Sequence, residues 1–459
     1  MILSVRTDAN IIRETTMSDT SEPSQEQNQE QNMRRVAMTS LAGTSIEWYD
    51  FFLYGTAAAV IFPKAFFPQD LPTMVLLIIS FSTLAVGFLA RPLGGIVFGH
   101  FGDRIGRKRT LVVALMMMGV ATTLIGLLPT YSSIGIAAPL MLVALRFIQG
   151  FAIGGQWGGA MLLVTESAPA DQRGWYGAYA QAGAPIGVIL ANLAFIGVSS
   201  SMSDEAFMDW GWRLPFIASI VLIGISMYIQ LKIEDTEAFR SLSDAQTDSD
   251  TAPQVVERSP VIVAIRKYPK RIMLAAGAFL SVQVTFYILI AFVIAYGMNS
   301  PSVELSRDTM LTAVLIAAAF MVPTQFYFSG LSDRLGRKSV YRWGAILTGV
   351  WGFALFPLID TGSPILICVA ITMGLLFLGM QYGPQAAYFT ELFSTEVRYS
   401  GASLGYQIGA IVGGALAPTI AVLLWNNFGI FYVSVYILIA ALMTLWSLAQ
   451  LEETKGNSL

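Results

Sequence analysis

The sequence predicts an all-α integral membrane protein in which twelve transmembrane helices form two pseudo-symmetric six-helix halves. Three observations support this fold class. Only 12% of the 459 residues are charged and 55% are hydrophobic, whereas soluble domains carry about 25% charge. Long apolar runs recur along the chain, and one short basic motif occurs twice. A chain with this composition needs a bilayer as its solvent.

The apolar runs are each about 18 to 27 residues long, which is enough for a helix to cross a hydrocarbon core of roughly 30 Å. Transmembrane strands are excluded because they alternate polar and apolar residues, and these runs do not. Each run therefore predicts one membrane-spanning helix. The predicted spans are 38–62, 73–98, 110–129, 138–163, 175–198, 213–231, 272–297, 309–329, 343–359, 363–389, 401–424 and 428–450.

Lys and Arg predict the orientation, because cytoplasmic loops are enriched in these residues. The odd-numbered loops hold little beyond Lys64, Arg213 and Arg307. Both termini are therefore predicted to be cytoplasmic, in a multi-pass protein of the cell membrane. The basic residues of the even-numbered loops are Arg104, Arg107, Lys108, Arg109, Arg173, Arg266, Lys267, Lys270, Arg271, Arg334, Arg337, Lys338, Arg342 and Arg398.

The polar regions divide the chain into five parts. Residues 1–35 are rich in Glu, Gln, Ser and Asn and are predicted to be a disordered cytoplasmic tail. No secretory signal peptide is expected, and either Met1 or Met17 is compatible with the start of translation. The other predicted parts are a six-helix half at 36–231, a cytoplasmic loop at 232–271, a second half at 272–450 and a cytoplasmic tail at 451–459.

The repeated motif reads GHFGDRIGRKRTL at 99–111 and SGLSDRLGRKSVY at 329–341. It follows the second predicted helix of each half, which indicates that the halves are copies of one six-helix unit, as in rocking transporters. A second pair of segments agrees, since ESAPADQRG follows helix four and ELFSTEVRYSG follows helix ten.

With these motifs, the chain resembles the major facilitator superfamily, whose signature is G-x-x-x-D-R-x-G-R-[RK] between helices two and three. SIEWYDFFLYG, FLARPLGGIVFGHFGDRIGRK, WGWRLPF and YGPQAAYFTELFSTEVRYSGASLGYQIGAIVGGALAP are similar to the metabolite:proton symporter family. That family includes shikimate, citrate, 2-oxoglutarate and proline/betaine transporters. One departure is Gln156, where members are expected to carry Glu.

The charges of the repeated loops are predicted to form a conformational latch that pairs in one state and separates in the other. Their alternative role is a solvated positive anchor, and the duplicated spacing favours the latch. The latch candidates are Asp103, Arg104, Arg107, Glu166, Arg173, Asp333, Arg334, Arg337, Glu391 and Arg398.

Two carboxylates lie within the first predicted helix, where an ionisable residue is by default functional. Asp50 has no obvious partner and is the first candidate for the proton carrier. Glu47 and Arg91 fall at similar depth, so they are expected either to form a structural ion pair or to take part in coupling.

The fourth predicted helix carries Arg146, Gln149 and Gln156 on one broad stripe. A buried guanidinium suits a substrate carboxylate; its alternative role is a hydrogen bond to helix one, for example to Asp50. Other polar residues are candidates for the substrate lining, although each one alone is more often a helix-to-helix hydrogen bonder. These residues are Tyr54, Gln283, Tyr287, Gln325, Gln381, Gln385, Tyr388 and Gln407.

The resulting functional prediction is proton-coupled symport of a small organic solute, with a carboxylate as the expected substrate and alternating access as the mechanism. The alternatives are a proline/betaine symporter and, less favoured, a non-transporting solute sensor. No nucleotide-binding loop or nucleophile–base pair occurs, so neither an ATP-driven pump nor an enzyme is expected. One Cys and one His exclude a zinc cluster. The expected partners are solute, protons and lipid, with no nucleic acid, no cofactor and a monomeric state.

Overall fold

The computed structural model of the chain describes residues 22–105, 107–154, 157–234, 260–394 and 397–457. These ranges contain helices and short connections, and no strand. The described residues of the twelve predicted spans lie on helices or on consecutive helical segments, and residues 155–156 of the fourth span lie outside the described residues. The all-helical fold class is therefore confirmed.

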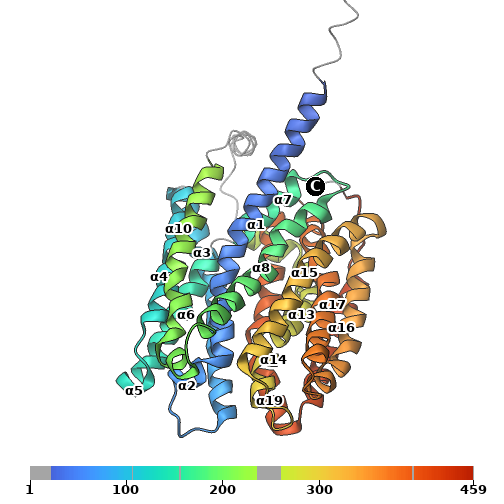
Figure 1. Cartoon of the computed structure of the whole chain (residues 1–459). Coiled ribbons are helices and arrows are strands. Elements are labelled where there is room, and N and C mark those ends of the chain that lie inside the picture. The colour runs from blue at the N-terminus through green and yellow to red at the C-terminus, as the bar shows by residue number, and fades with distance from the viewer. Residues whose placement is uncertain (1–21, 106, 155–156, 235–259, 395–396, 458–459) are drawn as a thin grey trace, which may run out of the picture.

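In the first half, the long helices are joined by tight connections that contain short helical turns (Figure 1). Its elements are α1 (Glu22–Val60), α2 (Phe62–Ala65), α3 (Thr73–Ile105), α4 (Arg107–Leu127), α5 (Tyr131–Ile134), α6 (Ala137–Gly154), α7 (Trp157–Ser167), α8 (Arg173–Ser199), α9 (Asp204–Ala206), η1 (Phe207–Gly211) and α10 (Arg213–Glu234).

In the second half, two of the spans are interrupted by π-helical turns, η2 and η4. Its elements are α12 (Pro260–Lys267), α13 (Pro269–Tyr287), η2 (Ile288–Phe292), α14 (Val293–Asn299), α15 (Arg307–Leu335), α16 (Arg337–Ile359), α17 (Pro364–Glu391), α18 (Arg398–Gly409), η4 (Ala410–Ala415), α19 (Ala417–Phe428) and α20 (Phe431–Gln450).

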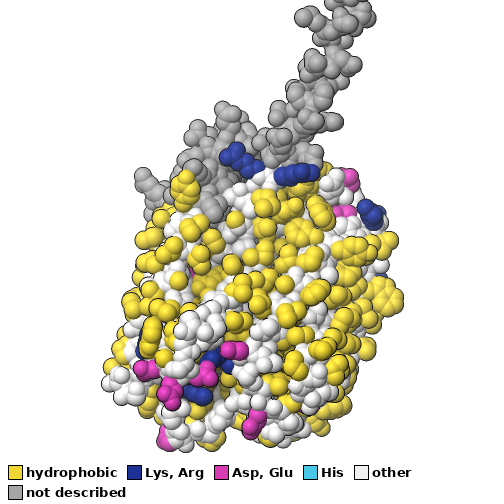
Figure 2. Space-filling view, viewed as in Figure 1, with side chains coloured by type: hydrophobic (Ala, Val, Ile, Leu, Met, Phe, Trp, Pro, Cys, Tyr) yellow, Lys and Arg dark blue, Asp and Glu magenta, His cyan; other side chains and the backbone are white. Residues whose placement is uncertain are grey.

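Nine helical segments of the described chain are long and apolar enough to cross a membrane, and a tenth crossing is formed by a pair bent by 51° between Gly211 and Arg213. Val112–Leu127 is a shorter apolar helix. The remaining span lies in α1, whose mean hydropathy is lowered by its polar first part. The surface agrees, because apolar side chains cover its middle and charged side chains gather toward its two ends (Figure 2).

Two polar segments differ from expectation. The part of the predicted disordered tail from Glu22 to Arg35 is helical, since α1 begins at Glu22; its Glu, Gln and Arg residues have high helix propensity, and a helix already formed in the membrane can be extended without a new nucleation step. The predicted loop at 232–271 contains α12, whose apolar face and basic last turn form a short amphipathic helix.

Three spans of the first half make most of the contacts with the second half. α8 packs against α15 and α17, α3 packs against η4 and α19, and α1 packs against η2 and α14. The start of α1 and the end of the chain lie at the same end of the bundle (Figure 1). We call this the terminal end, and the opposite one the far end.

Glycines bring α3 and α6 into direct backbone contact. A Cβ at Gly150 would lie 2.0 Å from the carbonyl oxygen of Gly87, and a Cβ at Gly94 would lie 1.8 Å from that of Phe151. The Gly-rich stretch of α18 and η4 has the same role, because a Cβ at Gly409 would lie 2.8 Å from the carbonyl oxygen of Ala276 on α13. These glycines therefore allow the backbones of neighbouring helices to pack closely.

We expect Gly150→Ala to force α3 and α6 apart and to lower the free energy of unfolding by about 1–3 kcal/mol. Thermal unfolding in detergent micelles measures this effect. Gly224→Ala in α10 is the matched control, because a Cβ there meets nothing within 4 Å and Ala is the better helix former. Equal melting temperatures for the Gly150 variant and the native chain would contradict the close packing.

Candidate functional site

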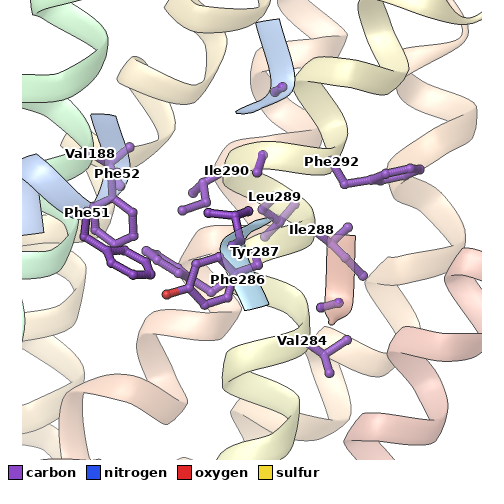
Figure 3. Packing of buried hydrophobic residues seen from close by; sticks show 14 of the residues in the cluster. Phe51, Phe52, Val188, Val284, Phe286, Tyr287, Ile288, Leu289, Ile290 and Phe292 are labelled. Atoms are coloured by element: carbon purple, nitrogen blue, oxygen red, sulfur yellow. The ribbon is translucent and has the colours of Figure 1, made fainter. Parts of the chain in front are cut away.

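A small cavity of about 10 Å³ lies where the two halves meet. The first half contributes Trp48 from α1 and Ala184 from α8 to its wall. Figure 3 shows the neighbouring aromatic layer, in which Phe51 and Phe52 of α1 face Phe286 and Tyr287 of α13. The lining residues of the second half are Phe279, Val282, Gln283, Phe286, Tyr287, Leu378, Tyr382 and Tyr406.

Arg91 is buried on α3 beside this cavity. Its guanidinium carbon lies 4.7 Å from the ring centre of Phe51 and 4.4 Å from that of Phe88. The hydroxyl groups of three cavity-lining residues of the second half, Tyr287, Tyr382 and Tyr406, are its electrostatic neighbours. Arg91 is therefore directed to the boundary between the halves.

Glu47 and Arg91 are expected from the sequence either to pair or to take part in coupling. The ion pairs between described residues do not include one that joins these two side chains. Equal depth in the membrane allows such a pair, but the rotation of α3 about its axis turns Arg91 toward the second half instead. Glu47 is half-buried on α1.

Arg146 on α6 is also fully buried and shares Phe51 with Arg91. Its guanidinium carbon lies 4.4 Å from the ring centre of Phe51 and 4.1 Å from that of Tyr54. The hydroxyl of Tyr54 donates to Thr83 Oγ1 at 2.7 Å, which fixes the ring below the cation. Contacts of this kind stabilise a desolvated guanidinium by about 2 kcal/mol.

Both guanidiniums keep unused donors. Nε and Nη2 of Arg91 and of Arg146 are buried and have no hydrogen-bond partner, and neither arginine forms an ion pair with a described carboxylate. Away from the terminal end, Asp50 is the other buried charged side chain of the first half among the described residues. Buried hydrogen-bond donors require partners, so these unused guanidinium donors favour the binding of an anion.

Asp50 is connected to Arg146 through two intervening side chains and not by the direct contact considered from the sequence. Arg146 Nη1 donates to Gln149 Oε1 at 3.2 Å, and Gln149 Nε2 donates to Thr122 Oγ1 at 2.7 Å. The Thr122 hydroxyl then has two acceptors, Asp50 Oδ2 at 3.3 Å and the carbonyl of Met118 at 2.9 Å. The proton candidate and the guanidinium are thus linked by a hydrogen-bonded relay across α1, α4 and α6.

The polar candidates of the second half separate into different environments. Gln283 and Tyr287 lie on the cavity wall. Gln381 is not among the cavity-lining residues: its Nε2 donates to Thr348 Oγ1 of α16 at 2.8 Å, and it connects two helices. The Tyr388 hydroxyl donates to the carbonyl of Glu452 at 3.0 Å, and Tyr388 is not among the residues that line this cavity.

The remaining glutamines lie off this cavity. The amide groups of Gln325 and Gln385 are buried with neither end hydrogen-bonded, and Gln407 is half-buried with an unpartnered Oε1. A period of 3.6 residues fixes which residues share a helix face, but the face that meets the cavity depends on neighbouring helices. Gln156 lies outside the described residues.

The latch candidates of the second half form a compact charged group at the terminal end. Arg337, the first residue of α16, is buried and bonds both oxygens of Glu391, at 3.3 Å from Nε and 3.1 Å from Nη2. Its Nη1 donates to Asp333 Oδ1 at 2.5 Å and to Ser332 Oγ at 3.0 Å. One guanidinium thereby connects the ends of α15, α16 and α17.

Two contacts of this group cross from one half to the other. The Asp333 carboxylate accepts hydrogen bonds from the backbone N–H groups of Gly174 and Trp175, both at 2.9 Å, and so caps the first turn of α8. Arg398 Nη1 donates to Glu166 Oε1 at 3.1 Å. A carboxylate at a helix N-terminus is stabilised by the helix dipole, so these contacts hold the halves together at the terminal end.

Other latch candidates are placed differently. Arg173 donates from Nη1 to the carbonyl of Asn457 at 2.7 Å, near the end of the chain. Arg334 has an exposed side chain and takes part through its carbonyl, which accepts from Lys455 Nζ at 2.6 Å. The side chains of Asp103, Arg104 and Arg107 lie outside the described residues.

The far end is closed by a smaller set of contacts. Arg307 Nη2 at the start of α15 pairs with Asp204 Oδ1 of the first half at 2.7 Å. Ser199 Oγ at the end of α8 donates to Asp308 Oδ1 at 3.2 Å. Contacts between the halves therefore exist at both ends of the bundle.

Some site residues were missed from the sequence. The cavity aromatics Trp48, Phe279, Tyr382 and Tyr406 belong to apolar runs that read as lipid or core contacts. Thr122 was missed because a single Thr in a transmembrane helix gives no signal of its own. Glu453 was assigned to a plain tail, although its side chain accepts four hydrogen bonds at the terminal end.

The sequence was compared with known proteins and families. Residues 42–403 match the Major Facilitator Superfamily. The chain belongs to this superfamily. The inner membrane metabolite transport protein YhjE of Escherichia coli K12 is 41% identical over 433 residues, which cover 93% of this chain and 95% of YhjE. The shikimate transporter of the same organism is 40% identical over 396 residues, covering 86% of this chain and 88% of that protein. The E. coli K12 proline/betaine transporter is 30% identical over 434 residues, covering 93% of this chain and 85% of its own length.

Among solved structures, the fold is similar to the partially occluded inward-open conformation of the xylose transporter XylE from E. coli. The TM-score is 0.69 at 18% identity, with 93% of this chain and 99% of XylE covered. This similarity shows the fold alone. In the superfamily, that fold has twelve membrane-spanning helices. Because the relatives are named as transporters, this chain is a multi-pass membrane transporter of small metabolites and not an enzyme.

Proposed function

We propose that this member of the superfamily is a proton-coupled symporter that takes up a small organic carboxylate by alternating access. The observation that carries the proposal is the pair of buried guanidiniums, Arg91 and Arg146, whose Nε and Nη2 donors have no hydrogen-bond partner. A guanidinium binds a carboxylate through two parallel hydrogen bonds. A substrate anion would use these donors and neutralise a desolvated charge.

Asp50 is the proposed proton carrier. It is buried on α1, and its Oδ1 has no hydrogen-bond partner, so protonation does not break an existing bond at that atom. Glu47 is the alternative carrier on this helix, because it is half-buried and also ionisable. A buried carboxylate that gains and loses a proton changes the charge of the site by one.

The relay supplies a route for coupling. When Asp50 is ionised, the Thr122 hydroxyl donates to it; when Asp50 is protonated, the same hydroxyl turns to the carbonyl of Met118, 2.9 Å away. Either orientation of the Thr122 hydroxyl alters the hydrogen bond that Gln149 Nε2 donates to Thr122. Gln149 in turn accepts a hydrogen bond from Nη1 of Arg146. Proton binding at Asp50 thereby frees Arg146 for the substrate, and this makes the two binding events interdependent.

The terminal end is proposed to be cytoplasmic because the basic loops gather there. The protein is then oriented with both termini inside the cell and works as a monomer, with each half moving against the other. No nucleotide or metal is required, since the proton gradient drives the cycle.

An osmolyte symporter is the second candidate, and a specific observation favours it. The cavity wall is aromatic, with Trp48, Phe279, Phe286, Tyr287 and two further tyrosines. Rings around a cavity bind quaternary ammonium groups through cation–π contacts. A betaine carries both a quaternary ammonium and a carboxylate, so it would use these rings and one guanidinium.

Uptake into proteoliposomes decides between these functions. Labelled carboxylates, betaines and sugars are offered with and without an inward proton gradient. We expect accumulation of a carboxylate above equilibrium with the gradient and mere equilibration without it. Betaine uptake without carboxylate uptake would favour the second candidate over the proposed function. Accumulation without a proton gradient would show that protons do not drive transport.

The latch gives a prediction that does not depend on the substrate's identity. Asp333→Asn removes the charge that caps α8 and pairs with Arg337. Charged hydrogen bonds contribute about 1.5–3 kcal/mol each, so we expect transport to fall about tenfold or more at unchanged membrane expression. Asp171→Asn, an exposed loop position, is the control. Native uptake by the Asp333 variant would show that the latch is only a solvated anchor.

A further inference from the structure

The ring of Phe51 contacts both guanidiniums of the candidate site. Phe51 lies on α1, and its side chain is 2% exposed. The guanidinium carbon of Arg91 lies 4.7 Å from the centre of this ring, and that of Arg146 lies 4.4 Å from it. The two carbons are therefore at most 9.1 Å apart, which is the sum of these distances. One uncharged ring thus joins two buried cations that come from α3 and α6.

The edge of each guanidinium that binds carboxylates is unused. Nε and Nη2 lie on one edge of the planar group, and together they can donate two parallel hydrogen bonds to a carboxylate. In Arg91 and in Arg146, both atoms are buried without a hydrogen-bond partner. The remaining nitrogen of Arg146, Nη1, donates to Gln149 instead. Both arginines therefore keep the edge that a carboxylate needs.

The spacing of the two arginines fits one carboxylate between them. N–H···O bonds of about 2.9 Å place a carboxylate carbon roughly 4 Å from the guanidinium carbon that donates them. A carboxylate bonded to both groups would separate their carbons by roughly 8 Å, which is within the limit of 9.1 Å. Its two oxygens offer about four lone-pair sites, enough for both guanidiniums. The ring centre of Phe51 lies at nearly the same distance from both arginines as this carboxylate carbon would.

The ring also stabilises the site while no anion is bound. Arg91 is an electrostatic neighbour of Arg146, and neither arginine forms an ion pair with a described carboxylate. Two like charges this close repel each other strongly in a low-dielectric interior. The negative face of an aromatic ring attracts cations, so Phe51 offsets part of this repulsion. A carrier that reorients without substrate requires such a contact.

Contacts across the boundary between the halves hold the ring in place. Phe51 packs edge-to-face against Phe88 of α3 and Tyr287 of α13, with ring centres 5.4 Å and 6.0 Å away. Figure 3 shows Phe51 on the side of α1 that faces Tyr287. Because Tyr287 belongs to the second half, separation of the halves removes the packing from one side of the ring. The ring can then move and expose the guanidinium donors.

We propose that Phe51 is a positioning residue that occupies the carboxylate position between Arg91 and Arg146 in the empty carrier, and that the substrate carboxylate displaces its ring. This inference deepens the proposed function and rests on it, because it assigns both arginines to the same carboxylate. A solute with a single carboxylate group satisfies both arginines, so a monocarboxylate is the substrate class that fits this site.

Fluorine NMR on the purified full chain tests the proposal without transport. Monofluorinated or trifluorinated phenylalanine is incorporated at position 51. Fluorine withdraws electron density from the ring face and weakens its attraction to cations, while the ring keeps its shape and the core its packing. Acetate is the probe, and it replaces chloride at constant ionic strength. We expect acetate to shift the fluorine signal. We also expect the trifluorinated chain to bind acetate about fivefold more tightly than the monofluorinated chain, because its ring is displaced more easily.

Phe66 is the matched control position. It is also buried, and it packs against Phe62 and Trp212. Within the described chain, Phe66 is not among the rings that contact a cation. We expect acetate to leave the signal of a fluorinated Phe66 unchanged. A similar shift at both positions would show a general response of the protein to acetate and would overturn the proposal.

The two arginines provide the second control. We expect the acetate-dependent shift at Phe51 to be lost when Arg91→Gln and Arg146→Gln are combined. A Phe51 signal that acetate does not change, or equal acetate affinities for the two fluorinated rings, would overturn this inference and leave the proposed symport intact if proteoliposomes accumulate a carboxylate. A shift at Phe51 without any carboxylate uptake would support the displacement of the ring and contradict the proposed symport.

Discussion

Asp50→Asn is expected to abolish uphill, proton-driven accumulation of substrate and to leave downhill exchange measurable. The variant keeps the shape of the side chain but holds no exchangeable carboxyl proton, so the substrate and the gradient are no longer linked. Exchange survives because Arg91 and Arg146 still supply their donors. Counterflow and gradient-driven uptake in the same proteoliposomes measure the two activities, and we expect the ratio of accumulated to external substrate to fall to about one.

Glu47→Gln is the matched control for this experiment. It is the other carboxylate of the membrane-embedded part of α1, and it is half-buried where Asp50 is 1% exposed. We expect this variant to retain accumulation. The reverse result, with accumulation lost in Glu47→Gln and kept in Asp50→Asn, would move the proton to Glu47.

Arg91→Gln is expected to weaken carboxylate uptake at low substrate concentration by about a hundredfold. Two charge-assisted hydrogen bonds contribute about 3 kcal/mol or more in total, and 1.4 kcal/mol corresponds to a factor of ten. The loss should appear as a raised KM, because Arg91 lies beside the cavity-lining tyrosines and not in the relay to Asp50. Initial rates of uptake over a range of substrate concentrations measure this.

Arg342→Gln provides the comparison, since this arginine is exposed on α16. Arg146→Gln is expected to affect both KM and coupling, because its guanidinium is bonded to Gln149 in the relay. Native carboxylate uptake by Arg91→Gln would show that Arg91 does not bind the substrate carboxylate, and it would favour the osmolyte alternative.

The burial of the two guanidiniums gives these charges their expected effects. Contacts join the halves at the terminal end through Asp333 and Arg398, and at the far end through Arg307. Water is the usual partner for unused guanidinium donors, and its exclusion raises the free energy of an empty, charged site. An occluded anion therefore stabilises this state, which is what a carrier requires in the middle of its cycle.

Several features could be predicted from the sequence because their causes are local. The length of each apolar run defines a span without reference to any neighbour, and the described residues of the twelve spans fall on helical segments. The duplicated loops led to the latch charges, and the structure joins Asp333, Arg337 and Glu391 in one group and Glu166 with Arg398 in another. Motif repetition preserves the spacing of these residues, so their proximity follows from the symmetry of the halves.

Other features depend on the tertiary structure alone. Glu47 and Arg91 lie at similar depths in the membrane, so the sequence allows them to pair. The rotation of α3 about its axis instead directs Arg91 to Tyr287 of the second half. Likewise, Asp50 reaches Arg146 only through Thr122 and Gln149.

The position of Glu453 is decided in the same way. Glu453 lies more than a hundred residues from the turn that it caps. Sequence determines which residues a helix carries and how deep they lie in the membrane. The rotation of each helix, and the partners that it presents, are settled by close packing against neighbours that are distant in the chain.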